Sequence, residues 1–225
     1  MEHSLERALD TQIEEAKRLI LIMAGSVELA LFEATEALLG RNPSKLKNIH
    51  QIENKINEDH IKIDECCLNI LAKQSPVAKD LRIILSILKI NTDLERMGDQ
   101  CTNIAYTTQD YLSRKELRQV SLISEMSEFV RAMVKKSLDC FVRGDAVGAK
   151  SILVMDDEVD ERKNRVFREL CEHMKKNPDD VDASLDLILI ARNFERLGDH
   201  ATNIAEDVIF AYTGSDIRHG GKSGS

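Results

Sequence analysis

Carboxylate side chains recur four positions apart in two stretches of the chain that lie one hundred residues from each other. The first stretch contains Glu95 and Asp99, and the second contains Glu195 and Asp199. Residues four apart on an α-helix share one face and lie about 6 Å from each other along its axis. Each pair therefore predicts a row of oxygen ligands on one helix. An asparagine follows four positions after each pair: Asn103 and Asn203.

Each of these pairs is preceded, about forty residues earlier, by a second polar pair with the same spacing. Neighbouring antiparallel helices would bring the two pairs face to face, and clustered side-chain oxygens suit hard or borderline divalent cations. We define the first acidic row as Glu53, Asn57, Glu95 and Asp99. We define the second acidic row as Asp156, Asp160, Glu195 and Asp199. The second row has four carboxylates, so we expect it to bind metal more strongly than the first, where Asn57 is uncharged.

A single Glu-x-x-x-Asp pair on a helix is weak evidence, because solvent-exposed helix faces tolerate such pairs. Two observations favour a ligand here. The pairs repeat in both stretches, and Gly98 and Gly198 lie in mid-helix at a cost of about 1 kcal/mol relative to alanine, which predicts a close approach to the backbone. The candidate metals are iron, manganese, magnesium and zinc. Thiolate-bound zinc is disfavoured because no cysteine lies in either row, and His200 is replaced by Gln100 in the other copy.

The acidic pairs belong to an internal repeat. Residues 94–105 read LERMGDQCTNIA and residues 194–205 read FERLGDHATNIA, so eight of twelve positions are identical. Repetition at this density indicates two copies of one structural unit. We assign residues 1–115 to the first copy and residues 116–213 to the second. The glycine- and serine-rich tail, residues 214–225, is expected to be disordered.

Apolar residues follow a 3.6-residue period through most of the chain, which predicts helices rather than strands. Each of the three prolines follows an asparagine or serine, the cap-and-proline pattern of a helix start. The expected helices span residues 4–40, 43–71, 76–112, 121–143, 145–176 and 178–212. Three long helices joined by short turns pack as an antiparallel bundle. The predicted fold is therefore all-α: six long helices in two tandem, internally repeated three-helix bundles.

Composition excludes several classes of function. The net charge is −8 and no basic face is visible, so nucleic acid is not an expected partner. The five cysteines are scattered and indicate reduced thiols in a cytoplasmic protein. No stretch has the roughly 18 apolar residues of a membrane span, and the N-terminus lacks the basic start of a signal peptide. Any association with a membrane is expected to be made through a partner.

The sequence contains no nucleophile paired with a base and no glycine-rich phosphate loop. A non-catalytic interaction protein is therefore the first hypothesis. The alternative is a metal-dependent enzyme that acts on a phosphoryl or redox substrate through the carboxylates. It predicts a turnover that is lost when Glu195 and Asp199 are both replaced by alanine.

Three segments, residues 76–82 (PVAKDLR), 93–105 and 192–206, together with the polar pairs that precede them, resemble the PhoU family of phosphate transport system accessory proteins. The resemblance covers about residues 5–212. It implies two three-helix bundles whose Glu(Asp)-x-x-x-Asp motifs bind iron or other divalent metal ions, here through the residues of the two acidic rows. It also implies a regulator that represses the phosphate starvation response and phosphate uptake. The implied partners are the ATPase of a phosphate ABC transporter, a sensor histidine kinase and a second copy of the chain, as a homodimer.

Overall fold

The protein is built from helices alone in the part of the chain that the structure, a computed structural model, describes, which is residues 2–217. The all-α prediction is confirmed. Most of the tail that was expected to be disordered, residues 218–225, lies outside the described residues.

The six long helices follow the order of the chain, and two short 3₁₀-helices precede the second and sixth of them. Their bounds are α1 (Glu2–Leu39), η1 (Pro43–Asn48), α2 (Ile49–Gln74), α3 (Ala78–Leu112), α4 (Val120–Arg143), α5 (Ala146–Lys176), η2 (Pro178–Asp180) and α6 (Val181–Thr213). The predicted ranges for the long helices are therefore correct to within about three residues, except at the start of the second, which begins at Ile49 rather than at residue 43.

The prolines lie before the long helices rather than at their first positions. Pro43 and Pro178 open η1 and η2, and Pro76 lies two residues ahead of α3. The Asn42 side chain accepts a hydrogen bond from the backbone N–H of Ser44 at 3.1 Å, which caps η1. Proline has a fixed φ and no N–H group, so it suits a tight 3₁₀ turn as well as an α-helical one.

The helices pack because each buries an apolar stripe at helical spacing. On α1 the stripe includes Ile20, Met23, Val27 and Leu31, all at most 1% exposed. The buried side chains of all six helices belong to one continuous hydrophobic core. Burial of this aliphatic surface is the main source of stability in such a fold.

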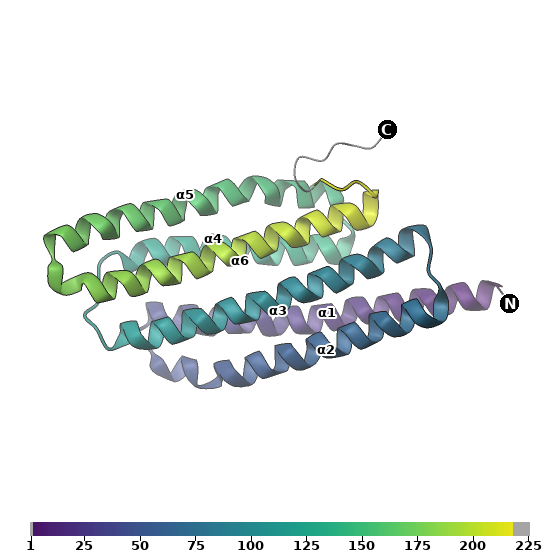
Figure 1. Cartoon of the computed structure of the whole chain (residues 1–225), viewed down its shortest axis with the longest axis horizontal. Coiled ribbons are helices and arrows are strands. Elements are labelled where there is room, and N and C mark those ends of the chain that lie inside the picture. Colours follow the sequence, from purple (N-terminus) through teal and green to yellow (C-terminus); the bar gives the residue numbers. More distant parts are fainter. Residues whose placement is uncertain (1, 218–225) are drawn as a thin grey trace.

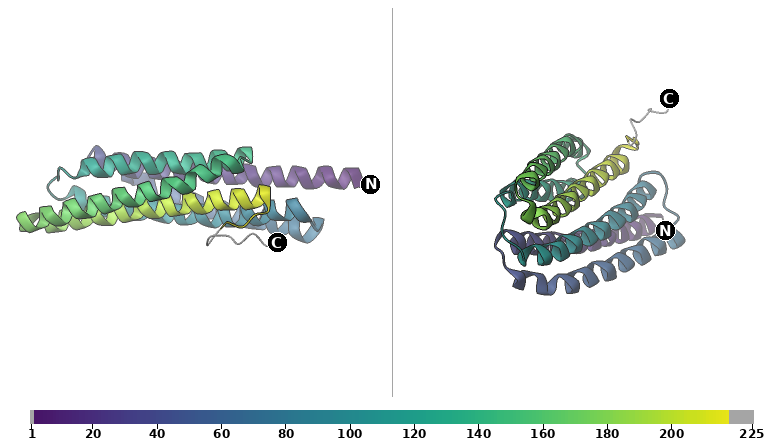
Figure 2. Two further views of the ribbon diagram at one scale, coloured as in Figure 1. Left: turned by 90° about the horizontal axis from the view of Figure 1, so that it is seen from above. Right: turned by 60° about the vertical axis from the view of Figure 1, so that its left-hand side comes forward.

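The two repeats form two three-helix bundles that lie against each other. Helices α1, α2 and α3 pack together, as do α4, α5 and α6. Figure 1 shows α5, α6, α3 and α2 as a front layer with α4 and α1 behind, and the right-hand view of Figure 2 separates the two bundles. The sequence predicted the bundles but not the extensive packing of α3 on α6, which we call the seam.

Helices α3 and α6 run antiparallel along the seam. Near the start of α3, the Ser86 hydroxyl donates to the backbone carbonyl of Asp207, near the end of α6, at 3.0 Å. Just beyond the end of α3, Arg114 Nε donates to Asp186, near the start of α6, at 2.6 Å. This arrangement places the repeated motifs of α3 and α6 at the middle of the molecule, with their acidic residues toward neighbouring helices.

The mid-helix glycines make room for side chains of the preceding helix. A Cβ atom on Gly98 would lie 3.0 Å from Cδ1 of Ile56, and one on Gly198 would lie 3.3 Å from Cγ1 of Val159. The expected close approach to the backbone is therefore present, but its cause is helix packing. These glycines let α2 approach α3, and α5 approach α6. Within each acidic row, the pair on one helix can then face the pair on the other.

Within residues 2–217, none of the helices has the length of apolar sequence needed to cross a lipid bilayer.

Candidate functional site

The second acidic row is drawn together across α5 and α6. Asp156 and Asp160 extend from α5, and Glu195 and Asp199 extend from α6. The Asp199 carboxylate interacts electrostatically with each of the other three. Thr202, a residue of the repeated motif, donates its hydroxyl hydrogen to Asp156 at 3.3 Å. Val159 packs on Gly198 beneath the row and sets the spacing of the two helices.

Crowding makes ionisation of this row unfavourable. The pKa of Asp199 is raised to about 6, first by partial burial and then by the charges of Glu195 and Asp156. The pKa of Asp156 is also raised, mainly by burial, against the hydrogen bond from Thr202, which lowers it. Burial and, after it, like charges raise these carboxyl pKa values, and a cation placed among the carboxylates would be stabilised.

A cation from the chain itself already lies in the second row. The Lys163 Nζ donates to Asp160 at 2.7 Å and to Glu195 at 2.7 Å, so its ammonium bridges α5 and α6. Partial burial opposes the charge of this lysine, but the two carboxylate hydrogen bonds outweigh it and raise the pKa of Lys163. The remaining two carboxylates, Asp156 and Asp199, have no lysine or arginine partner within the described residues.

The first acidic row is more open. Burial raises the pKa of Asp99 on α3, and the nearby charge of Glu53 on α2 raises it further. Glu53 also lies 3.4 Å from Nδ1 of His50. Asn57 is exposed and Glu95 is half-buried. Across residues 9–217, no lysine or arginine forms an ion pair with a residue of this row.

A polar network replaces Lys163 in the first bundle. His60 occupies the repeat position of Lys163, and its Nδ1 lies 3.4 Å from the backbone oxygen of Asn91. The buried Asn91 amide donates to the backbone of His60 at 3.0 Å and to Asp64 at 2.9 Å. His60 therefore contacts Asn91 and Asp64, at the end of the row away from Glu53.

A third polar cluster crosses the seam between the two rows. Asp93 on α3 is 7% exposed, and its Oδ1 lies 2.8 Å from Nδ1 of His200 and 3.1 Å from Nδ2 of Asn203. An ionised carboxylate accepts hydrogen bonds only, so both partners on α6 donate to it. Asn203 follows Asp199 by four positions on α6, but its amide is directed to Asp93 rather than to the second row. His200 also lowers the pKa of both Asp99 and Asp199, after the larger effects of burial and of neighbouring carboxylates.

Sequence reasoning missed Lys163, Asp93 and the seam role of His200. The signal for Lys163 was present, because it lies three and seven positions after the aspartates of α5, on the same helix face. Nothing in the sequence shows which residues face another bundle. Among residues 9–217, no group of three or more His, Cys, Asp or Glu side chains is already arranged to hold a metal ion.

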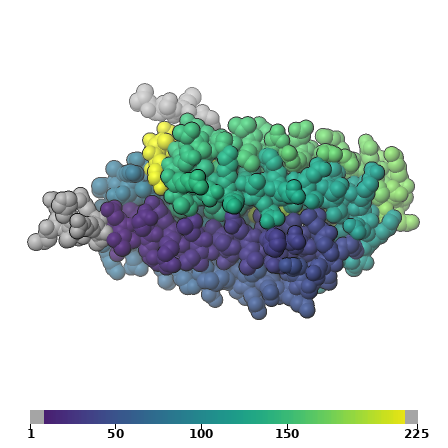
Figure 3. All heavy atoms as spheres, turned by 180° about the vertical axis from the view of Figure 1, so that it is seen from behind, coloured from purple at the N-terminus to yellow at the C-terminus, as the bar shows by residue number. Residues whose placement is uncertain are grey.

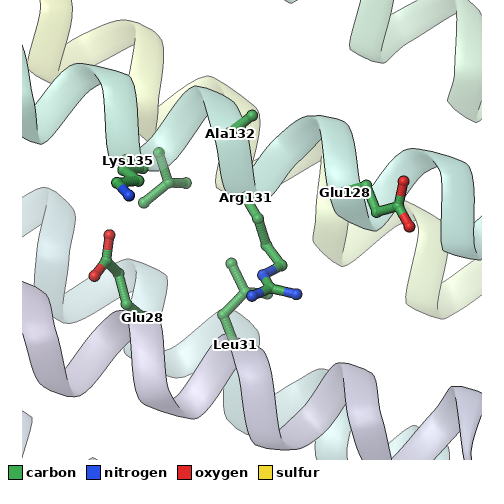
Figure 4. Close-up of a pocket in the computed structure, with 7 residues that line it drawn as sticks. Glu28, Leu31, Glu128, Arg131, Ala132 and Lys135 are labelled. Atoms are coloured by element: carbon green, nitrogen blue, oxygen red, sulfur yellow. The ribbon is translucent and has the colours of Figure 1, made fainter.

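A separate pocket lies on the face formed by α1 and α4 (Figure 3). It has a volume of about 430 Å³, and Figure 4 shows Glu28, Glu128, Arg131 and Lys135 around it. Two acids and two bases give this pocket no net charge. The Arg131 guanidinium lies over the Phe32 ring, 5.2 Å from its centroid, which stabilises the packing of α4 on α1. This balance of charge gives the pocket no preference for a metal cation.

Replacing Asp199 with asparagine should stabilise the metal-free protein. The folded-state pKa of about 6 lies above the reference value of 3.8, so ionisation of Asp199 costs folding free energy above pH 6. Asp199 is closely surrounded by α5 and α6 but remains accessible to solvent, which screens the effect, so we expect a gain of about 1 kcal/mol at pH 7.5. The difference between variant and wild type should shrink as the pH falls through 6 toward 4.

Thermal unfolding in EDTA at several pH values measures this difference. Glu161→Gln, at an exposed carboxylate of α5, is the control and should leave stability nearly unchanged. A destabilised Asp199→Asn variant at pH 7.5 would contradict the repulsion described for the second row.

The fold and these clusters define an all-helical protein made of two copies of a three-helix bundle, each with facing acidic residues on its second and third helices. The family model described as PhoU domain matches residues 20–108 and again residues 123–208. The chain belongs to the PhoU family.

Similar proteins cover nearly the whole chain. The phosphate-specific transport system accessory protein PhoU homolog of Pseudomonas putida is 36% identical over 220 residues, which are 97% of this chain and 86% of that protein. The protein of the same description from Pseudomonas aeruginosa is 35% identical to this chain over 218 residues, which are 96% of this chain and 90% of that protein.

Two solved structures are similar to this one. The crystal structure of PhoU from Pseudomonas aeruginosa superposes with a TM-score of 0.89 at 35% identity, covering 92% of this chain and 99% of that one. The phosphate transport system regulatory protein PhoU from Streptococcus pneumoniae superposes with a TM-score of 0.84 at 26% identity, covering 92% of this chain and 98% of that one. The six-helix arrangement and its seam belong to a fold found in solved members of the family.

Proposed function

We propose that this protein is a regulatory accessory protein of a phosphate transport system, which restrains phosphate uptake and the phosphate starvation response. The observation that carries the proposal is similarity over nearly the full chain to relatives named as accessory proteins of phosphate-specific transport. The family model matches both repeats, so the proposal concerns the whole chain rather than one of its bundles.

The proposed mode of action is docking rather than catalysis. The partners are the ATPase of a phosphate ABC transporter and a sensor histidine kinase, reached in the cytoplasm, and the protein acts as a homodimer. A net charge of −8 favours association with basic protein surfaces over nucleic acid. Rigid helices held by one continuous core suit a protein that presents fixed surfaces to two partners.

We also propose that the acidic rows bind divalent or iron metal ions. The donor types fit, because carboxylate and amide oxygens suit hard and borderline cations. The raised pKa values of Asp99 and Asp199 support the proposal, since a cation would relieve the crowding of carboxylates that contributes to them. A bound metal ion would supply positive charge between α2 and α3, or between α5 and α6, and so stabilise the closely packed helix pairs. The residues that would hold it are those of the two rows.

Deletion of this protein should derepress phosphate-responsive genes in phosphate-rich medium. Without the accessory protein, the kinase no longer receives the signal that phosphate is abundant, so expression of the transporter should rise at least tenfold. Transcript measurement in the deletion strain checks this, with the wild-type chain supplied in trans as the control.

Capture of the tagged chain from phosphate-replete cells should retain the transporter ATPase or the kinase. Normal repression in the deletion strain would contradict the regulatory proposal. Repression lost together with a measurable turnover by the purified protein would instead favour the enzyme hypothesis.

A further inference from the structure

The two acidic rows differ in how their charge is compensated. In the second row, the Lys163 ammonium lies 2.7 Å from carboxylate oxygens of both Asp160 and Glu195. It ties α5 to α6 at the level of the repeated motif, and the lysine side chain is only 28% exposed. Two short charge-assisted hydrogen bonds from two helices are a specific arrangement, unlike a mobile surface ion pair.

Lys163 brings the second row to the same formal charge as the first. Three carboxylates and the neutral Asn57 give the first row a charge of −3. Four carboxylates and one ammonium give the second row a charge of −3 as well. The additional carboxylate of the second row, Asp160 in place of Asn57, is one of the two that Lys163 contacts.

In the first row, no lysine or arginine of the described residues takes the place of Lys163. At the repeat position of Lys163 the first bundle has His60, which contacts the Asn91 backbone at 3.4 Å and Asp64 at 3.5 Å. Neither of these residues belongs to the row. The space next to Glu95 that corresponds to the Lys163 ammonium is therefore not taken by a lysine or arginine among the described residues.

We propose that Lys163 is a built-in cation of the second acidic row, so that this chain binds divalent metal preferentially in its first bundle. This reverses the order expected from counting carboxylates, and it rests on the metal binding proposed above. A metal ion that enters the second row must either displace the ammonium from Asp160 and Glu195 or bind beside a like charge. Both routes weaken its binding relative to the first row, where no lysine or arginine among the described residues pairs with a carboxylate and where His50 lies 3.4 Å from Glu53.

Manganese(II) is the probe for the test, because carboxylate oxygens suit it and its free ion is counted directly by electron paramagnetic resonance. Glu95→Gln/Asp99→Asn leaves only the second row able to bind, and Glu195→Gln/Asp199→Asn leaves only the first. We expect the protein with the first row intact to bind Mn²⁺ at least tenfold more tightly. Tenfold corresponds to about 1.4 kcal/mol.

Replacing Lys163 with an uncharged residue should raise the affinity of the second row for Mn²⁺. In the Glu95→Gln/Asp99→Asn background, Lys163→Met should raise Mn²⁺ affinity at least tenfold, and Lys163→Gln should do the same. Lys163→Arg keeps the charge and should leave the affinity unchanged. In the Glu195→Gln/Asp199→Asn background, where only the first row can bind, His60→Lys should place an ammonium within reach of Glu95. This substitution should weaken Mn²⁺ binding at least tenfold.

Equal Mn²⁺ affinity of the two rows with Lys163 intact would overturn the proposal, as would an unchanged affinity in Lys163→Met. Absence of Mn²⁺ binding in every variant would instead contradict the proposed metal binding, and thermal unfolding in EDTA then decides the role of the lysine. A built-in cation predicts that Lys163→Met lowers the unfolding temperature by several degrees and that adding Asp160→Asn restores most of the loss. An unchanged unfolding temperature in Lys163→Met would overturn the proposal on this second measurement.

Discussion

Replacement of Asp93 with alanine should lower the free energy of unfolding by about 2–4 kcal/mol. Asp93 is buried in the seam, where it accepts hydrogen bonds from His200 at 2.8 Å and from Asn203 at 3.1 Å. Alanine removes both hydrogen bonds. The His200 side chain is only 13% exposed, so water cannot fully replace its lost partner, whereas the exposed Asn203 amide can turn to water. The loss falls on the contact between the bundles rather than within either of them.

Urea denaturation measures this effect. The repeat counterpart of Asp93 is Asn193, which is equally buried but donates to the Leu189 carbonyl of its own helix at 2.9 Å. Asn193→Ala should therefore cost about 1 kcal/mol, the net worth of one ordinary hydrogen bond. Equal losses in the two variants would mean that the cluster contributes no more than a local hydrogen bond.

Gly144→Ala should cost about 2–4 kcal/mol, for two separate reasons. Gly144 ends α4 with a φ of +64°, in the left-handed region that side chains with a Cβ atom avoid. A Cβ atom here would also lie 2.5 Å from Cε1 of Tyr212, near the end of α6. The ring would have to move, and the end of α6 would lose its contact with the turn between α4 and α5.

Two other glycines separate these causes. Gly214 has a φ of +76°, but the nearest atom to its added Cβ would be Cζ of Arg82 at 3.5 Å, an ordinary contact. Gly214→Ala should therefore show the backbone cost alone, about 1–2 kcal/mol. Gly25, in the middle of α1, has nothing within 4 Å of an added Cβ, and Gly25→Ala should stabilise by up to about 1 kcal/mol. If Gly144→Ala and Gly214→Ala lower the free energy of unfolding by the same amount, the contact with Tyr212 makes no measurable contribution to stability. Thermal unfolding measures both values.

The helices and their buried faces were predictable because local chemistry determines them. A 3.6-residue apolar stripe identifies the inner face of α1, and a glycine or asparagine identifies most helix ends. The internal repeat predicted that the helices form two bundles. The acidic residues of α5 and α6 were correctly predicted to face each other, since their spacing and that of Val159 and Gly198 fix the register of one helix on the next.

The seam was not predictable from the same information. Ser86, Asp93 and Asp207 are polar, so a stripe of apolar residues gives no sign that they are buried, yet each lies between α3 and α6. Whether a second face of a helix is covered depends on contacts between residues more than one hundred positions apart. The same limit applies to Lys163, whose position on the face of α5 was readable but whose bond to Glu195 depends on the approach of α6.

The single core that extends through both repeats makes the molecule one cooperative unit. The repeats can be divided near residue 115 in sequence, but a fragment ending there would expose Ser86 and Asp93 to solvent with no α6 to bond them. Unfolding of one bundle therefore removes support from the other, and the whole chain should melt in one transition. By thermodynamic linkage, a ligand held in either row would raise the free energy of unfolding of the whole chain, so that binding in one bundle would also protect the other bundle from unfolding.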